Sequence, residues 1–202
     1  MTSLIRRLAF DLALARERIG HAISGRLECR PHHPTEGRDS PYASLRFQVG
    51  GEDALLCYGR PSVRGREIFG ALVPFGELWR TGANEPTTLH LPFRASVAGL
   101  EVPRGVYSLY TVPGEQWLVV LNRSTRQSGR TRDERGRAGN SFPNAYTALV
   151  ASAEVGRAPV PSRGCDHVEQ LTFRAESAPD RSAHLVLAWE RTEVTIPIAR
   201  AH

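Results

Sequence analysis

The amino-acid sequence predicts an all-β fold, either an antiparallel β-sandwich or a jelly-roll-like barrel, with an amphipathic helix before it. Apolar and polar residues alternate in many short segments, which is the pattern of strands with one buried face. Glycine and proline separate these segments, as expected of turns. Strand and helix patterns do not alternate, so a parallel α/β sheet is not indicated. The 202 residues, 41% hydrophobic and 23% charged, suit one globular domain with a substantial core.

The first 41 residues predict a helix and a linker. Within residues 1–25, Leu4, Leu8 and Leu12 recur near helical spacing with charged residues between them. Asp11 interrupts the apolar run that a secretory signal needs, and no stretch reaches the ~20 apolar residues of a membrane span. We expect the helix to dock on the body, to mediate homo-oligomer formation or, as the least favoured alternative, to touch a membrane surface. Residues 26–41 are polar and rich in Pro and Gly, which indicates a linker.

Residues 42–198 predict the β domain. The segment 117–122 is apolar on both faces, which favours a central strand. The other strand candidates show period-two alternation or short apolar runs, and they contain Leu45, Phe47 and Val49; Leu56 and Tyr58; Leu89, Leu91 and Phe93; residues 106–111; Leu171 and Phe173; Leu185, Leu187 and Trp189; and Val194, Ile196 and Ile198. Many short strands joined by turns are typical of sandwiches and barrels.

Composition and motifs exclude several kinds of chemistry. All 26 basic residues are arginines, so lysine Schiff bases, a Walker lysine and a Ser-Lys pair are excluded. Ser62, Ser108 and Ser124 lie in no GxSxG motif, and no GxGxxG, P-loop, HExxH or EF-hand pattern occurs. We therefore expect no cofactor.

The formal charge of +5 raises the question of nucleic-acid binding. The densest basic run comprises Arg123, Arg126, Arg130, Arg132, Arg135 and Arg137. Glycine, serine and acidic residues are mixed into this run, which favours a mobile, solvated loop over a polyanion-binding arm. We expect no specific nucleic-acid partner.

The three cysteines, Cys29, Cys57 and Cys165, are odd in number and far apart in the sequence. This pattern predicts no disulfide framework and favours a reducing, cytoplasmic compartment. Cys29 lies near His32 and His33, but the paired spacing of a zinc site is missing, so we expect no metal.

The stretch Tyr58 to Leu91, YGRPSVRGREIFGALVPFGELWRTGANEPTTLHL, looks like a functional site in an otherwise ordinary β-protein. Long ordered loops in compact domains are usually functional. Its candidate ligand-binding residues are Arg60, Arg66, Trp79, Arg80, Asn84 and Glu85. Arginine forks suit carboxylate or phosphate, but the same arginines could instead pair with the loop's glutamates and pin it to the sheet. We expect the loop to fold over one end or face of the sheet and to bury Ile68, Phe69, Leu72, Val73 and Phe75.

The sequence Asn84-Glu85-Pro86 predicts a fixed corner that presents a carboxylate. Asn84 tolerates a left-handed conformation, and Pro86 pushes Glu85 toward an extended one. Beside Arg80, Glu85 is expected to be ionised, which suits a general base, a ligand acceptor or a structural tie. His90 alternates with apolar residues and is expected on a solvated polar face.

Three functions remain open from these residues. The first is binding of a small polar or anionic ligand. The second is a hydrolase- or lyase-type enzyme with Glu85 as catalytic base and Arg60 or Arg80 stabilising developing negative charge. The third is a structural or assembly module that uses the N-terminal helix.

The segments YGRPSVRGREIFGALVPFGELWRTGANEPTT, VPRGVYSLYTVPGEQWLVVLN and LVLAWERTEVTIPI resemble the bacterial domain-of-unknown-function 2911 family, over about residues 40–198. The resemblance implies a β-rich fold and no established activity. Its family motifs fall on Arg60, Arg66, Trp79, Arg80, Asn84 and Glu85, among other positions. Family members commonly follow an export leader, so the resemblance adds export as the alternative to a cytoplasmic location. Here the leader carries Asp11 and lacks a lipobox cysteine.

Overall fold

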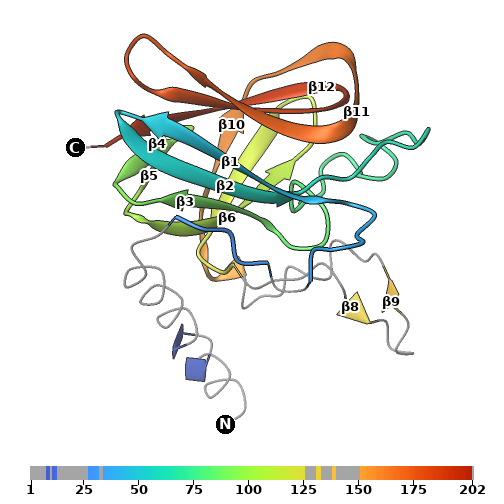
Figure 1. Ribbon diagram of the computed structural model, residues 1–202, viewed down its shortest axis with the longest axis horizontal. Coiled ribbons are helices and arrows are strands. Elements are labelled where there is room, and N and C mark those ends of the chain that lie inside the picture. The colour runs from blue at the N-terminus through green and yellow to red at the C-terminus, as the bar shows by residue number, and fades with distance from the viewer. Residues whose placement is uncertain are drawn as a thin grey trace.

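A computed structural model describes residues 8, 9, 11, 12, 27–31, 34–125, 131, 132, 138, 139 and 151–201. The elements that the structure describes from Tyr42 to Arg200 are β-strands (Figure 1). The strands are β1 (Tyr42–Val49), β2 (Glu52–Gly59), β3 (Thr87–Leu91), β4 (Ala95–Val97), β5 (Leu100–Val102), β6 (Gly105–Val112), β7 (Trp117–Asn122), β8 (Thr131–Arg132), β9 (Ala138–Gly139), β10 (Glu154–Val160), β11 (Ser162–Ser177) and β12 (Ala183–Arg200).

The strands form two main antiparallel sheets. One sheet has six strands in the order β1-β2-β3-β6-β7-β10, and the other has four in the order β11-β12-β4-β5. β8 and β9 pair only with each other among the described strands. The described strand orders are open, ending at β1 and β10 in one sheet and at β11 and β5 in the other. The prediction of an antiparallel β fold is therefore confirmed, whereas the barrel alternative is wrong for the described part of the chain.

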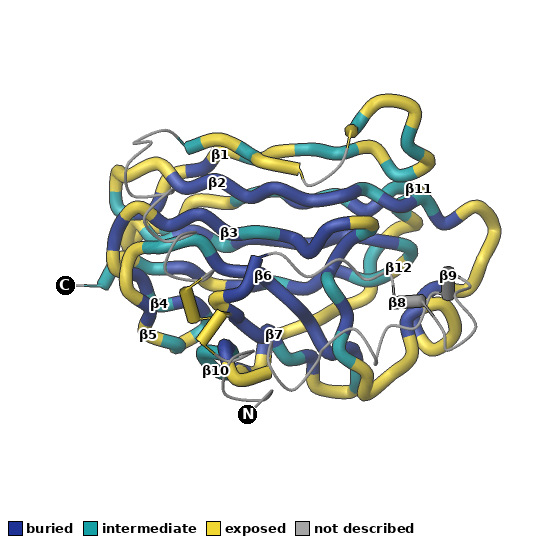
Figure 2. Tube along the Cα trace, turned by 90° about the horizontal axis from the view of Figure 1, so that it is seen from below, coloured by how far each residue is buried: buried dark blue, intermediate teal, exposed yellow. Residues whose placement is uncertain are grey.

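One core lies between the two sheets. Leu56 and Leu89 point inward from the six-stranded sheet, while Leu187 and Ile196 point inward from the four-stranded one, and all four are fully buried. Figure 2 shows the six-stranded sheet from below, with β2, β3 and β6 buried along most of their length. Each such side chain contributes about 1.5 to 3 kcal/mol on burial, which explains why period-two alternation was a reliable signal for these strands.

The N-terminal helix predicted over residues 1–25 lies outside the described residues, apart from residues 8, 9, 11 and 12, so it stays a prediction. Among the residues with a described placement, no helix is long and apolar enough to span a bilayer. Most of the arginine-rich stretch 123–140 also lies outside the described residues, so its predicted mobility stays a prediction.

The segment between residues 27 and 41 is tied to the domain more firmly than a simple linker. Cys29 forms a disulfide with Cys57 of β2, and their Cα atoms are 5.7 Å apart. The expectation that the cysteines form no disulfide is therefore wrong for this pair. Separation along the sequence does not limit pairing once the segment lies against β2, where the Cα distance suits a disulfide. Cys165 is a free thiol.

Candidate ligand-binding pocket

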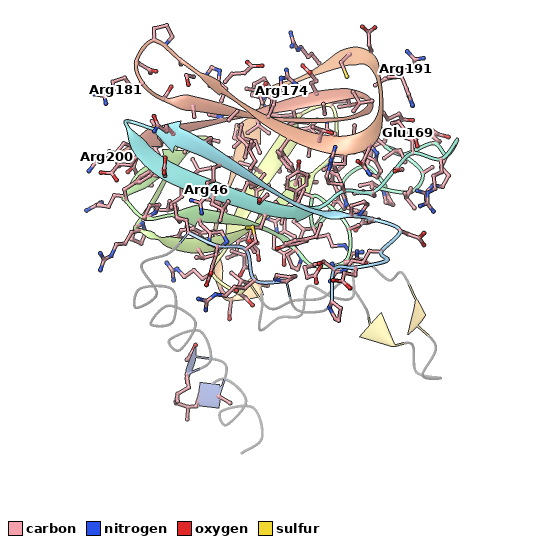
Figure 3. All side chains as sticks on the ribbon, viewed as in Figure 1. Arg46, Glu169, Arg174, Arg181, Arg191 and Arg200 are labelled. Carbon is pink, nitrogen blue, oxygen red and sulfur yellow. A yellow bond between two sulfur atoms is a disulfide. The ribbon has the colours of Figure 1, made fainter. Side chains whose placement is uncertain are left out.

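The loop between β2 and β3 follows a path fixed by backbone hydrogen bonds at one end of the sandwich (Figure 1). Trp79 exchanges two hydrogen bonds with Thr111 of β6, at 2.7 and 2.9 Å, so the loop extends the line of β3 along β6. On the other side, the Val63 amide donates to the Glu169 carbonyl of β11 at 2.8 Å. Figure 3 labels Glu169, in the middle of β11, on the side of the molecule where this loop lies. The loop therefore bridges both sheets.

The return of the loop passes so close to β2 that glycine is required there. A Cβ atom added to Gly59 would lie 2.2 Å from the carbonyl oxygen of Ala83. Two residues before Ala83, Thr81 is fully buried and has φ 58°. This left-handed backbone conformation is strained for a β-branched residue. Such strain persists only where the surroundings enforce it, and it is enriched at functional sites. Asn84 has φ 64°, which confirms the left-handed conformation predicted for it.

Burial of the loop's apolar residues is only partly as expected. Ile68, Phe69 and Val73 are buried, but Leu72 is 43% exposed and Phe75 is 59% exposed. The prediction that the last two are buried is wrong. The tip turns outward between Gly70 and Gly76, whose φ values are 101° and 78°. Phe75 packs over Gly70 instead, where an added Cβ would lie 2.8 Å from its ring.

An aromatic cluster lies beneath the loop. The rings of Trp79 and Trp189 stack with centroids 5.6 Å apart and an interplanar angle of 19°. Phe69 makes edge contacts with both rings and with Trp117, at centroid distances of 5.0 to 5.9 Å. All three tryptophans of the chain therefore converge here. Offset and edge contacts of this kind add about 0.5 to 1.5 kcal/mol per pair.

A pocket of about 220 Å³ opens between the loop and this cluster. It is lined by Ser40, Pro61, Arg66, Leu72, Val73, Pro74, Glu77, Leu78, Trp79, Arg80, Gly82, Ala83 and Trp189. Three of the residues selected from the sequence, Arg66, Trp79 and Arg80, are brought together in this lining. Arg60, Asn84 and Glu85 are not among the lining residues.

Trp189 is the lining residue that the sequence reasoning missed as a site residue. Its side chain is 1% exposed, and its indole Nε1 has no hydrogen-bond partner in the described part of the chain. By contrast, Trp79 Nε1 donates to the Gly82 carbonyl at 3.3 Å. Most buried polar groups have a hydrogen-bond partner. The Trp189 N–H is an exception among the described residues. The family-like segment LVLAWERTEVTIPI contained this residue and was the signal that could have found it.

An irregularity in the four-stranded sheet accompanies Trp189. Ala188 pairs with Thr172 and Glu190 pairs with Val168, so β11 has extra residues opposite Trp189. Glu190 has φ 57°, and its carboxylate accepts a hydrogen bond from the Ile68 amide at 3.3 Å. Bulges commonly re-aim side chains beside binding sites. Periodicity alone could not predict this irregularity, because alternation assumes a regular strand.

The two pocket arginines are held by backbone carbonyls. Arg66 donates from Nε to the Val63 carbonyl at 3.0 Å and from Nη2 to the Ser62 carbonyl at 2.6 Å. None of the described ion pairs involves Arg66, so no carboxylate in this part of the chain neutralises it. Arg80 donates from Nη1 to the Asn84 carbonyl at 3.1 Å. These bonds orient both guanidinium groups toward fixed backbone positions.

Tyr110 is a buried neighbour of Arg80 on the outer face of the six-stranded sheet. Burial raises the pKa of its phenol to about 12, although a hydrogen bond to Ser108 and the charge of Arg80 both oppose this shift. The phenol is therefore neutral at physiological pH.

Glu85 is buried and pairs with Arg38, a residue of the predicted linker. The two carboxylate oxygens accept from Arg38 Nη1 and Nη2 at 2.7 and 2.8 Å. The side chains of Arg38 and Glu85 are 11% and 4% exposed. This hydrogen bond to Glu85 is the main cause that raises the pKa of Arg38 above its ordinary value. Nearby, burial and then the charge of Glu85 raise the pKa of Tyr42 to about 12, with Arg38 opposing.

Arg60 fixes the start of the loop to β11. Its Nε donates to the Leu171 carbonyl at 3.1 Å and its Nη2 to Thr172 Oγ1 at 2.9 Å. This is the structural alternative that the sequence left open for the loop arginines, except that the partners are a carbonyl and a hydroxyl and not glutamates.

His90 does not lie on a solvated face, so that expectation is wrong. It is 5% exposed, with Nε2 at 3.2 Å from Thr88 Oγ1 and 3.6 Å from Cys57 Sγ. Ser108 and Asn122 on the same outer face of the sheet are also buried. The prediction that this face of the sheet is polar is correct, but the face is covered and not exposed to solvent. Polar residues can line a covered face when they have hydrogen-bond partners.

Within the described residues, no group of three or more His, Cys, Asp or Glu side chains is placed to hold a metal ion. Comparison with known proteins gives a match to one family model, described as a protein of unknown function (DUF2911), over residues 40–198. Comparison with curated proteins and with solved structures gives no match. The matched range contains every strand described up to β11 and most of β12, together with the whole pocket lining. The chain therefore belongs to the DUF2911 family.

Proposed function

We propose that the pocket binds a small polar or anionic ligand. The observation that carries this proposal is the buried indole N–H of Trp189, a pocket-lining residue without an acceptor in the described residues, in the same lining as Arg66 and Arg80. The nitrogen itself is covered, and the proposal requires the side chains over it to shift when the ligand binds. A ligand oxygen would then supply the missing acceptor.

Charge supports an anionic group on the ligand. Guanidinium groups are permanently charged and present planar forks that match carboxylate and phosphate oxygens. Arg66 is oriented by two carbonyls before any ligand arrives. Orientation in advance lowers the entropy lost on binding. Glu77 is also in the lining, so the three charged side chains give the pocket a net positive charge.

Among the described contacts, none favours the enzyme alternative with Glu85 as general base. Both carboxylate oxygens accept hydrogen bonds from Arg38, and Glu85 lies outside the pocket lining. This arrangement supports the structural tie, one of the three roles left open for Glu85. The assembly module depends on the N-terminal helix, which lies outside the described residues.

We also propose that the protein works in an oxidising compartment, the exported alternative to a cytoplasmic location. The support is the Cys29–Cys57 disulfide, because disulfides persist mainly in oxidising surroundings.

A thermal-shift screen with anionic and polar metabolites tests the binding proposal. A ligand present at 100 times its Kd should stabilise the native protein by about 2.7 kcal/mol and raise its Tm. Replacing Arg66 by Gln should weaken binding about tenfold or more, since a hydrogen bond to a charged group contributes about 1.5 to 3 kcal/mol. Trp189→Phe should also weaken it, because it keeps an aromatic ring and removes the donor.

Arg94→Gln is the matched control, because Arg94 is exposed and outside the pocket lining. It should leave ligand-dependent Tm shifts unchanged. The proposal fails if no compound shifts the Tm, or if the shifts are the same in the Arg66→Gln and Trp189→Phe variants as in the wild type.

A further inference from the structure

The tip of the loop exposes apolar side chains beside the pocket. Among the described residues of the β domain, the large apolar side chains that are exposed are Leu72 and Phe75. Leu72 is also a lining residue of the pocket, as are Val73 and Pro74 between it and Phe75. Exposed apolar side chains grouped at the rim of a pocket commonly mark a binding surface. The rim is therefore continuous with the pocket wall.

The lining divides into two chemical types. The charged groups and the indole donor are supplied by Arg66, Glu77, Arg80 and Trp189. Most of the other side chains are apolar, namely Pro61, Leu72, Val73, Pro74, Leu78 and Ala83. A fully hydroxylated sugar or inorganic phosphate would leave this apolar wall without matching surface, because the hydrophobic contribution scales with the apolar area buried.

Size narrows the ligand further. The pocket volume of about 220 Å³ is below the ~300 to 1,000 Å³ typical of sites for drug-sized molecules. One water molecule occupies about 30 Å³ in the liquid, so the pocket has the volume of several water molecules. A single small inorganic anion would therefore leave much of the pocket unfilled. A metabolite-sized organic molecule fits this range.

The backbone of the loop tip is anchored beneath its exposed side chains. The Val73 amide donates to the Ile68 carbonyl at 2.8 Å, and the Gly70 amide donates to the Val73 carbonyl at 2.9 Å. Leu72 can therefore change its side-chain position against a ligand while the main chain stays in place. The apolar rim is presented on a fixed support.

We infer that the ligand is a small amphipathic organic acid, with one carboxylate and a compact apolar body. The inference rests on the proposed function and names the ligand class for the same pocket. The carboxylate binds to Arg66 and accepts the Trp189 N–H. The apolar body lies along Leu72 and Pro74, where it covers the exposed rim.

A matched series of compounds tests this assignment on the full chain. Cyclohexanecarboxylate carries both features, cyclohexanecarboxamide lacks the charge, and acetate lacks the apolar body. Inorganic phosphate, citrate and gluconate supply hydrophilic anions. Binding is measured by Tm shift and by titration calorimetry. We expect cyclohexanecarboxylate to bind at least tenfold more tightly than any of the other five compounds.

Two variants separate the parts of the ligand. Leu72→Ser should weaken binding of cyclohexanecarboxylate about fivefold, the factor expected when about 40 Å² of apolar surface is no longer buried. Because Leu72 is exposed, this variant should fold normally. The same change should leave the binding of acetate unaltered. Arg66→Gln should weaken binding of both carboxylates.

The outcomes distinguish this inference from the binding proposal beneath it. One outcome is that phosphate, citrate or gluconate binds as tightly as cyclohexanecarboxylate and loses that binding in Arg66→Gln. In that case the assignment of an amphipathic acid is wrong, and the proposal that the pocket binds an anion is retained. Equal binding of the carboxamide, or an unchanged affinity in Leu72→Ser, also overturns the inference. If none of the six compounds and no member of the wider metabolite screen binds, both fail.

Discussion

Replacing Arg38 by Met is expected to lower the free energy of unfolding by about 3 to 5 kcal/mol, because it removes the guanidinium that pairs with the buried Glu85 carboxylate. The two side chains are 11% and 4% exposed and form two hydrogen bonds of 2.7 and 2.8 Å. Water cannot easily replace a guanidinium at such a site. Urea denaturation at neutral pH measures the loss, provided that the slope with denaturant stays constant.

Arg30 provides the matched control for this change. It pairs with Glu28, but their side chains are 50% and 49% exposed. Arg30→Met should therefore cost about 0.5 kcal/mol or less. Adding Glu85→Gln to Arg38→Met should recover part of the loss, since an amide is less costly to bury than an unpaired charge. If Arg38→Met costs no more than Arg30→Met, the pair does not secure this corner.

Breaking the Cys29–Cys57 disulfide should lower the free energy of unfolding by about 3.5 kcal/mol. This is the loop-closure value for the 28 residues that separate the two cysteines. Cys29→Ser is the cleaner change, because Cys29 is half-buried whereas Cys57 is fully buried. Adding a reducing agent to the wild type should lower its stability to that of the variant. The variant itself should not respond to the reducing agent.

Cys165→Ser is the control for the disulfide, because Cys165 is a free thiol. Its stability should respond to reducing agent as the wild type does. Alkylation of the unfolded, unreduced wild type should detect one thiol, and alkylation after reduction should detect all three cysteines. Detection of three thiols before reduction would contradict the disulfide.

The strands could be predicted because one face of each is buried in a shared core. The alternation of Leu45, Phe47 and Val49 and the two-sided apolar run at 117–122 both correspond to strands, β1 and β7. The disulfide and the Arg38–Glu85 pair could not be predicted in this way. Each joins residues that are distant in the sequence, and no local pattern specifies such contacts.

The sequence predicted which loop forms the candidate site, but it did not predict all of the residues that line the pocket. Arg66, Trp79 and Arg80 line one pocket, as their shared loop suggested. Glu85 was expected beside Arg80, but the backbone corner at Asn84 is followed by a buried contact with Arg38. Trp189 was read as a core residue of a strand, which it is. Only the three-dimensional arrangement shows that it also borders the pocket and lacks an acceptor among the described residues.

The most direct test of ligand binding is the indole N–H signal of Trp189 in a proton–nitrogen NMR spectrum. The three tryptophans should give three such signals, and Trp189→Phe identifies one of them by its loss. When the anion with the largest thermal shift is titrated in, the Trp189 signal should move progressively and by more than the Trp79 signal, whose N–H already donates to Gly82. Saturable binding of that anion with an unchanged Trp189 signal would contradict a ligand that accepts this hydrogen bond.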